Sequence, residues 1–462
     1  MPANSPVPIP KLFLERMENY LGESQFPAFA AAMEATPKSG LRVNSLKLSA
    51  EQFQAISPFK LGGKVAWCPS AYHLLGDDRP GLHAYHTAGL YYLQDPSAMS
   101  AAELLAPQPG ERILDLAAAP GGKATHLAAL LQGKGLLVAN EIKDKRVGHL
   151  AQNVERWGAG NIVVTNESPE RLADQFGPYF DRVLVDAPCS GEGMFRKDMG
   201  ARADWSLEMV AGCAIRQKNI LHVAAKLVRP GGHLLYSTCT FAPEEDEGVI
   251  EQLLVDFPDF EVVQLQLFPG FTSGKPTWIN ARPELTGAVR LFPHLLEGEG
   301  HFACLLKRRG EVQDSEKAWS YRSSGLAKQY ASLWRAFATE TLNLELPEDR
   351  LRVFGERLYF LPPLSPDFGR LRIVHPGVWL GSFKKDRFEP AHPLAMLLKQ
   401  GDAKKTHNLN LSGVELPAYL HGEVLASDAQ GWTVVTVNGF PIGWGKGVQG
   451  MLKNHYPRGW MV

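Results

Sequence analysis

The chain has few cysteines and none in a close pair. Five cysteines are spread over 462 residues, with no Cys-x-x-Cys spacing. Their odd number and wide separation argue against a disulfide scaffold and against a structural zinc site. We therefore predict free thiols in a reducing compartment and no bound metal. The five are Cys68, Cys189, Cys213, Cys239 and Cys304.

Long apolar runs and an excess of charge are also missing. No apolar stretch approaches the ~18 residues of a membrane span, and the proline-rich start over 1–14 does not have the pattern of a signal peptide. The 48 Lys and Arg residues balance 49 Asp and Glu residues, so the chain as a whole is not a polybasic coat for nucleic acid. These absences favour a soluble cytoplasmic protein, with a monomer as the simplest expectation.

What is present is enough apolar sequence for more than one core. Hydrophobic residues make up 45% of the chain and charged residues 21%, which is typical of globular domains. Changes of pattern along the chain predict four regions. They are an N-terminal domain over 1–95, a catalytic domain over 96–308, an intermediate domain over 309–395 and a C-terminal domain over 396–462.

The region 96–308 alternates short apolar strands with helices. The expected strands are 112–116, 135–140, 162–165, 181–186 and 233–237, and the expected helices are 125–131, 146–157, 215–227 and 244–255. Nearly continuous apolar strands between helices are typical of a parallel sheet that is covered on both faces. We predict a doubly wound, Rossmann-like α/β core, which binds ligands at the carboxyl ends of its strands.

The flanking regions have different patterns. Residues 1–95 indicate helices with short strands, and a helix is expected at 325–340. From about residue 400, short strands separated by Gly and Pro predict a β-rich domain. Its end interleaves aromatic and basic residues, of which we expect most aromatics to be core and a minority to touch RNA. They are Trp432, Phe440, Trp444, Tyr456 and Trp460, with Lys446, Lys453 and Arg458.

A loop of small residues, 115–123, follows the first strand and opens a helix. Small residues allow a ligand to approach the backbone closely, and Glu141 ends the next strand, where such sheets place an acid on a ribose. An ordinary tight turn is the alternative interpretation. Since the loop lacks both GxGxxG and GxxxxGK[ST], S-adenosylmethionine suits it better than a dinucleotide or a nucleoside triphosphate.

Two cysteines follow two of the expected strands. Cys189 comes shortly after Asp186, and Cys239 comes shortly after the strand 233–237. Because parallel strands end at one edge of the sheet, we expect these residues to meet Glu141 and the loop in one cleft. The other three cysteines are expected to be buried core residues.

Two thiols and a carboxylate beside a methyl donor suit methylation at carbon 5 of a pyrimidine. A thiolate that adds at carbon 6 makes carbon 5 nucleophilic, and a carboxyl group beside the ring can bond N3 and the exocyclic amine. A base must afterwards remove the carbon-5 proton. The spacing alone does not say which thiol is the nucleophile.

Taken in order, these motifs resemble the Nol/Nop/Sun (Fmu-like) family of RNA cytosine-5 methyltransferases, and within it the bacterial RsmF-type members. The resemblance covers nearly the whole chain. It rests on Arg42–Lys47, Gln94–Ala98, Asp115–Lys123, Asp186–Lys197, Ser237–Thr240 and the closing segment Pro441–Arg458.

The resemblance implies S-adenosylmethionine-dependent methylation of cytosine carbon 5 in small-subunit (16S) ribosomal RNA, free or in the subunit. It implies that Cys239 is the nucleophile and that Cys189 assists release, with Asp186 and Lys123 beside them. The implied cofactor residues are Ala117, Ala118, Ala119, Pro120, Gly121, Gly122, Lys123, Glu141, Ser168 and Asp186. The implied RNA contacts are Arg42, Asn44, Arg196 and Lys197.

One position departs from the family pattern. Many members carry an acid after the third strand, near the adenine amine, where this chain has Ser168. Three alternatives also stay open at this stage. They are a nucleotide-dependent oxidoreductase, a non-catalytic RNA-binding assembly factor, and an amine methyltransferase that needs no cysteine.

Overall fold

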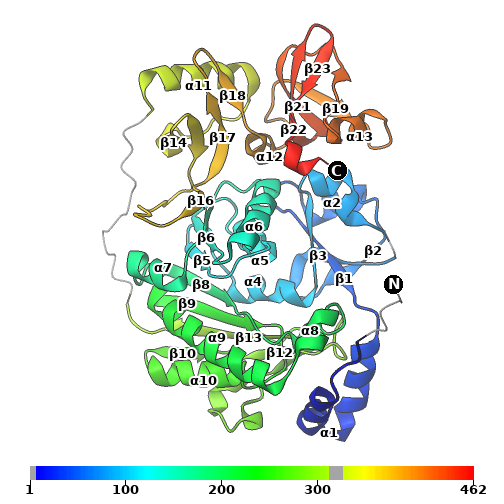
Figure 1. The fold of residues 1–462 in the computed structure, drawn as a ribbon, viewed down its shortest axis with the longest axis vertical. Coiled ribbons are helices and arrows are strands. Elements are labelled where there is room, and N and C mark those ends of the chain that lie inside the picture. Colours follow the sequence, from blue (N-terminus) through cyan, green and yellow to red (C-terminus); the bar gives the residue numbers. More distant parts are fainter. Residues whose placement is uncertain (1–6, 77, 312–325, 462) are drawn as a thin grey trace.

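The computed structural model describes residues 7–76, 78–311 and 326–461. These residues form four sheets. Figure 1 shows the largest sheet in the middle of the molecule, helix α1 at one end and the two C-terminal sheets at the other. Within the described residues, no helix is long and apolar enough to cross a membrane.

The largest sheet confirms the predicted doubly wound core. Five parallel strands lie in the order β7-β6-β5-β8-β9, and β13 pairs antiparallel with β9. The strands are β5 (Arg112–Asp115), β6 (Leu136–Asn140), β7 (Ile162–Thr165), β8 (Phe180–Asp186), β9 (Val228–Thr238) and β13 (His301–Arg308). Short strands β10 (Phe260–Val263), β11 (Phe271–Ser273) and β12 (Val289–Leu291) extend the β13 side.

Helices cover both faces of this sheet, because each strand alternates its apolar side chains between two hydrophobic clusters. One cluster includes residues of α4 (Ser100–Leu105), α5 (Gly122–Leu130) and α6 (Asp144–Trp157). The other includes residues of α7 (Pro169–Phe176), α9 (Leu207–Leu227) and α10 (Glu247–Asp256). A short helix, α8 (Met199–Asp204), precedes α9.

An observed helix differs from its predicted boundaries where a capping side chain sets the first residue of the helix. Helix α9 begins at Leu207, earlier than the predicted 215, because the Ser206 side chain accepts a hydrogen bond from the Met209 amide and caps it. Strand β9 begins at Val228, earlier than the predicted 233.

The N-terminal region packs an antiparallel sheet of order β2-β3-β1-β4 against helices. Its elements are α1 (Lys11–Glu34), β1 (Ser39–Val43), α2 (Ala50–Ile56), β2 (Leu61–Val65), β3 (Cys68–Leu74), α3 (Ala84–Thr87) and β4 (Tyr91–Gln94). Buried residues of this sheet share one hydrophobic cluster with the C-terminal sheet, although the two are far apart in sequence.

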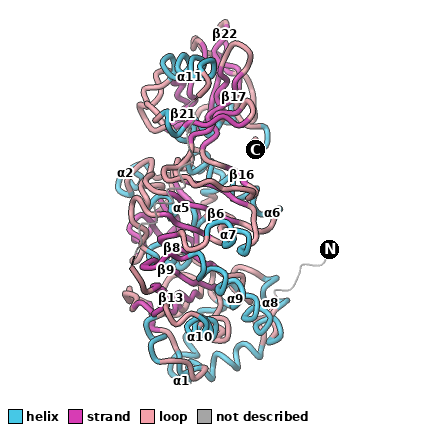
Figure 2. The backbone as a smooth tube through the Cα atoms, turned by 90° about the vertical axis from the view of Figure 1, so that its left-hand side faces the viewer, coloured by secondary structure: helices cyan, strands magenta, loops and turns pink. Residues whose placement is uncertain are grey.

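Two smaller sheets follow the core (Figure 2). The first holds β14 (Leu351–Phe354), β15 (Arg357–Phe360), β17 (Val378–Phe383) and β18 (Phe388–Pro390), with α11 (Lys328–Thr341) and α12 (His392–Leu397). The predicted helix at 325–340 corresponds to α11, and residue 325 lies outside the described residues. The second sheet holds β19 (Thr406–Leu409), β20 (Leu425–Ala426), β21 (Gly431–Val437), β22 (Phe440–Val448) and β23 (Met451–Asn454), with α13 (Glu415–Leu420).

The intermediate region also adds a strand to the catalytic sheet. Strand β16 (Ile373–His375) pairs antiparallel with the edge strand β7. The sequence pattern contains no signal for this pairing, because the two segments are about two hundred residues apart.

Candidate active site

Two thiols meet at the carboxyl edge of the sheet. Cys189 follows β8 and Cys239 follows β9, and their sulfur atoms lie 3.3 Å apart. Both side chains are partly accessible, whereas Cys68, Cys213 and Cys304 are buried, as the sequence predicted. The structure therefore brings together the two cysteines that were singled out.

The two thiol-bearing loops are braced against each other. The Gly193 amide donates to the Cys239 carbonyl at 2.9 Å. The buried Glu192 carboxylate accepts from the Phe241 amide at 2.9 Å and the Thr240 hydroxyl at 3.0 Å. Glu192 was not among the predicted site residues, although it lies within the motif Asp186–Lys197. Such bracing fixes the distance between the two sulfurs.

The two sulfurs influence each other's chemistry. The hydrogen bond with Cys239, together with burial, raises the pKa of Cys189 well above its ordinary value. Cys189 is therefore a protonated thiol at neutral pH and can donate its S–H to the neighbouring sulfur.

An ion pair lies beside the thiols. Lys123 Nζ donates to Asp186 Oδ2 at 2.7 Å, and the Ser237 hydroxyl donates to Asp186 Oδ1 at 2.9 Å. Burial disfavours the lysine's charge, but the Asp186 carboxylate outweighs it, and the pKa of Lys123 is raised. Since Lys123 comes from the first turn of α5, this pair connects the small-residue loop to β8.

The small-residue loop is held open by α6. The Asn153 side chain donates to the Pro120 carbonyl at 2.8 Å, and Arg146 donates to the Ala119 carbonyl. Gly121 has φ +116°, and a Cβ there would lie 3.3 Å from the Asn153 Cβ. Glycine is needed at this turn, which lets a ligand reach the backbone.

Two buried acids next to this loop keep carboxylate oxygens that accept no hydrogen bond from the described residues. Glu141 is 2% exposed; its Oε1 accepts from the Lys143 amide at 2.8 Å, and its Oε2 is ion-paired with Arg146 at 3.4 Å without a hydrogen bond. Asp115, at the end of β5, is fully buried, and neither of its oxygens has a hydrogen-bond partner in that part of the chain. Burial, with the nearby Asp186 carboxylate, raises the pKa of Asp115 to about 7.

Buried acceptors without hydrogen bonds are uncommon in native proteins, and these two acids lie beside one loop, where they are available to bond a ligand. A ligand with ribose hydroxyls and an ammonium group, such as S-adenosylmethionine, would satisfy both acids. Asp115 was not singled out in the sequence, although its place as the last residue of a strand was the available signal.

Ser168 has a structural task in this fold. It is the N-cap of α7 and accepts from the Arg171 amide at 3.4 Å. The acid beside it, Glu167, accepts from the Arg372 amide at 2.6 Å, next to strand β16. The adenine contact expected of Ser168 stays a prediction.

Burial contradicts the RNA contacts predicted for Arg42 and Asn44, which are both 0% exposed. Arg42 donates at 2.9 Å to the Gly122 carbonyl and to the Thr125 hydroxyl. Asn44 donates at 2.8 Å to the Trp157 carbonyl. Their hydrogen bonds attach the N-terminal sheet to α5 and α6, which flank the small-residue loop. Because both side chains are fully buried, neither presents a surface to RNA.

Burial also contradicts the RNA contact predicted for Arg196, but it does not contradict the one predicted for Lys197. Arg196 is 8% exposed and donates to the buried Glu299 carboxylate at 2.7 Å. Lys197 donates to Asp95 at 2.6 Å, and its side chain keeps 26% exposure. Of the four predicted RNA contacts, only Lys197 is placed where a phosphate could reach it.

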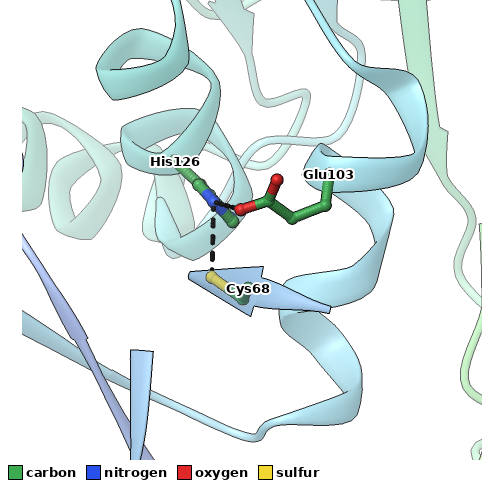
Figure 3. A group of neighbouring side chains, drawn as sticks. All are labelled: Cys68, Glu103 and His126. Atoms are coloured by element: carbon green, nitrogen blue, oxygen red, sulfur yellow. Dashed lines mark hydrogen bonds and ion pairs between the residues drawn. The ribbon is translucent and has the colours of Figure 1, made fainter. Parts of the chain in front are cut away.

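Cys68, Glu103 and His126 form a second polar cluster (Figure 3). His126 Nε2 lies 2.9 Å from Glu103 Oε1 and 3.8 Å from Cys68 Sγ. Burial raises the pKa of Cys68 to about 12 and lowers that of His126 to about 4, so both are neutral. The buried Arg42 guanidinium interacts with Cys68 and Glu103 and supplies the positive charge here. The cluster joins β3, α4 and α5.

The doubly wound fold, with two thiols and an ion pair at its carboxyl edge, is that of the α/β methyltransferase class. Comparison with protein families narrows this class. The sequence matches four family profiles. They are 16S rRNA methyltransferase RsmB/F over 102–307, the N-terminal domain of 16S rRNA methyltransferase RsmF over 9–96, the first C-terminal domain of RsmF rRNA methyltransferase over 336–398, and the methyltransferase RsmF PUA domain over 406–462.

Individual relatives agree with these profiles. The chain is 31% identical to ribosomal RNA small subunit methyltransferase F of Vibrio vulnificus over 98% of both chains. It is 32% identical to the protein of that name from Shewanella oneidensis, over 93% of this chain and 92% of that one. A solved methyltransferase homolog protein from Pyrococcus horikoshii covers 65% of this chain and 96% of its own, with 30% identity and a TM-score of 0.59. The chain belongs to the RsmF family of 16S rRNA methyltransferases.

Proposed function

We propose that this protein methylates carbon 5 of a cytosine in 16S ribosomal RNA, with Cys239 as nucleophile and Cys189 assisting its release. The observation that carries this proposal is the pair of sulfurs 3.3 Å apart beside the Lys123–Asp186 ion pair. Methylation of an amine or a hydroxyl needs no thiol nucleophile, whereas carbon 5 needs one to become reactive.

The cofactor residues proposed are the loop 117–123, with Glu141 accepting from the ribose and Asp115 and Asp186 nearby. When bound, S-adenosylmethionine supplies the methyl group. The unsatisfied oxygens of Asp115 and Glu141 support this assignment. Ser168 and Lys197 keep their proposed adenine and RNA contacts.

The chain's own residues account for the chemistry at the ring. The Cys239 sulfur adds to carbon 6, while the Asp186 carboxylate accepts from the exocyclic amine and the Lys123 ammonium stabilises the charge that develops on the ring. The protonated Cys189 thiol donates to the Cys239 sulfur as that sulfur leaves as a thiolate. The raised pKa of Cys189 suits this donor role.

The substrate proposed is 16S rRNA, free or in the small subunit, with the C-terminal region 396–462 as its binding domain. The match of residues 406–462 to a PUA domain profile supports an RNA-binding role for the C-terminal region. The basic residues interleaved with its aromatics, Lys446 among them, are the proposed contacts; Lys446 Nζ lies 5.3 Å from the Trp432 ring centroid.

The first prediction separates the two thiols. Cys239→Ala should abolish methyl transfer with RNA binding retained, and Cys189→Ala should accumulate a protein–RNA adduct because release stalls. The measurement is a denaturing gel after incubation with methyl-labelled S-adenosylmethionine and unmodified small-subunit RNA or subunits. Cys304→Ala is the control, because this buried thiol lies on β13 away from the site.

Label in free RNA from wild type, together with a slow labelled band from Cys189→Ala alone, is the expected result. Label that still reaches RNA through Cys239→Ala would reject covalent chemistry. It would favour transfer to an amine.

A further inference from the structure

A buried histidine near the Lys123–Asp186 ion pair has no role in the proposed chemistry. His301 is the first residue of β13 and is 5% exposed. Its Nδ1 lies 2.9 Å from the Ser97 hydroxyl oxygen. Its Nε2 has no hydrogen-bond partner within the described part of the chain, so one ring nitrogen is unused.

The neighbours of His301 determine which nitrogen carries the proton. The Ser97 hydroxyl donates to Asp95 and accepts from the Glu299 amide at 3.1 Å. Burial disfavours the Asp95 charge, but the Lys197 ammonium at 2.6 Å keeps the pKa of Asp95 below its ordinary value. Because a hydroxyl has one proton, Ser97 can only accept from His301. Nδ1 therefore bears the proton, and Nε2 bears a lone pair.

The register of the sheet places His301 at the active site. Phe302 pairs with Thr238, the last residue of β9, and Ala303 pairs with Ser237. Directly paired residues of antiparallel strands share a face, and residues two apart on a strand share it too. His301 therefore lies on the face of Ser237, which donates to Asp186. The His301 side chain belongs to the face that carries the ion pair, at the end of β9 where the chain continues to Cys239.

Electrostatics agree with this position. Burial and then the Lys123 ammonium lower the pKa of His301 to about 4, with Asp186 acting in the opposite direction. The imidazole is therefore neutral throughout the neutral pH range, and its Nε2 lone pair is available to accept a proton.

The order of the strands defines the side on which a base is needed. The cofactor loop and Glu141 lie at β5 and β6, on one side of β8, and Cys239 and His301 lie at β9 and β13 on the other. If the loop and Glu141 held the methyl donor opposite the thiol, the carbon-5 hydrogen would lie on the thiol side of the ring. The base that removes this hydrogen must come from the thiol side.

On the thiol side of β8, the other candidate groups that the structure describes hold a proton or accept hydrogen bonds. The pKa of Cys189 is raised, so its thiol holds its proton. Both Asp186 oxygens already accept hydrogen bonds, from Lys123 and from Ser237. His301 Nε2 is the neutral acceptor without a partner.

We propose that His301 is the general base that removes the carbon-5 proton after methylation, an inference that rests on the proposed cytosine-5 chemistry. Nε2 takes the proton, and the C–H electron pair becomes the C5–C6 double bond. The C6–S bond breaks and its electrons go to Cys239, which leaves as a thiolate. The imidazolium then releases this proton to solvent, which restores the neutral His301.

The test compares His301→Phe and His301→Ala with His233→Ala. His233 lies on β9 at the far end of the strand, opposite Lys307, and serves as the control histidine. Single-turnover reactions with methyl-labelled S-adenosylmethionine are quenched, and labelled adduct and labelled free RNA are separated on a denaturing gel. Calorimetric binding of S-adenosylmethionine shows that each variant is folded.

In both His301 variants, the methylated adduct should form at the wild-type rate. Release of labelled RNA from the adduct should be slower by ~100-fold or more, the usual loss when a general base is removed. Added imidazole should speed release in His301→Ala, where it can occupy the vacated space, and not in His301→Phe. His233→Ala should behave as wild type.

Three results would overturn the proposal. They are wild-type release by His301→Phe, failure of that folded variant to form any adduct, and release that imidazole does not restore in His301→Ala. Failure of the cytosine-5 proposal itself is distinguishable, because wild type would then label a position other than carbon 5 and Cys189→Ala would trap no adduct.

Discussion

At the scale of single residues, two buried acids beside the small-residue loop mark the candidate active site. Most charged side chains in the core have a partner, as Arg290 has in Glu247. Asp115 and Glu141 instead keep oxygens without hydrogen bonds beside the cofactor loop. Burial of an oxygen without a hydrogen bond costs stability. A bound ligand that donates to these oxygens would offset this cost.

Asp115 gives a pH-dependent prediction at this scale. Burial, then Asp186, raise its pKa from 3.8 to about 7, so between these values the unfolded carboxyl loses its proton while the folded one keeps it. The free energy of unfolding of the wild type should therefore fall as pH rises through this window and level off above it. Asp115→Asn should remove this dependence and be more stable than wild type by roughly 2–4 kcal/mol near pH 8.

Urea unfolding of the ligand-free protein at about pH 4.5 and about pH 8 measures this difference. Asp174→Asn, an exposed substitution on α7, is the control. Equal pH dependence in wild type and Asp115→Asn would mean that Asp115 is ionised in the folded state.

At the scale of elements, the end of α6 is where the catalytic core meets the C-terminal regions. Gly158 ends this helix with φ +73°, and a Cβ there would lie 2.1 Å from the carbonyl oxygen of Met396 in α12. Helix α12 in turn packs on both β17 and β22. One glycine therefore permits the close approach that attaches both small sheets to the core.

Gly158→Ala should destabilise the protein by roughly 2–4 kcal/mol, since the added methyl collides with backbone and the left-handed conformation disfavours alanine. Gly148→Ala is the matched control in the same helix, because nothing lies within 4 Å of its Cβ position. The control should be neutral or more stable by ~0.5–1 kcal/mol. Thermal unfolding compares the two, and equal stabilities would show that α12 moves away at little cost.

At the scale of the whole molecule, the first and last regions of the chain stabilise each other. Buried residues of β1, β3 and β4 share a hydrophobic cluster with residues of β19, β21 and β22. The Asn438 side chain also donates to the Tyr85 hydroxyl at 2.7 Å. Since the N-terminal sheet in turn holds the cofactor loop through Arg42, the C-terminal region supports the active site indirectly.

Removal of residues 406–462 should therefore loosen the N-terminal sheet. Amide hydrogen exchange in β1 and β4 is expected to become at least about tenfold faster, because their apolar cover is lost. Exchange in β8 and β9 should change little, since the cluster on that face of the core contains no residue of the deleted segment. Unchanged exchange in β1 would show that the shared cluster adds no stability.

The sequence by itself determined the elements and the order of the motifs. Apolar runs such as 162–165 correspond closely to observed strands, and the positions of Cys189 and Cys239 after two strands predicted their meeting at one edge. These properties depend on local periodicity and on the general rule that parallel strands end together, so they can be read from neighbouring residues.

Only the tertiary structure decided which polar side chains face solvent and which form hydrogen bonds inside the protein. The family resemblance implies that Arg42 and Arg196 contact RNA, yet both are buried against partners that lie about eighty and one hundred residues away. The same holds for β16 on β7 and for His301, whose proton position follows from Ser97 and Asp95. A charge pattern states what a side chain can bond, but its partner is set by long-range packing, which local sequence does not contain.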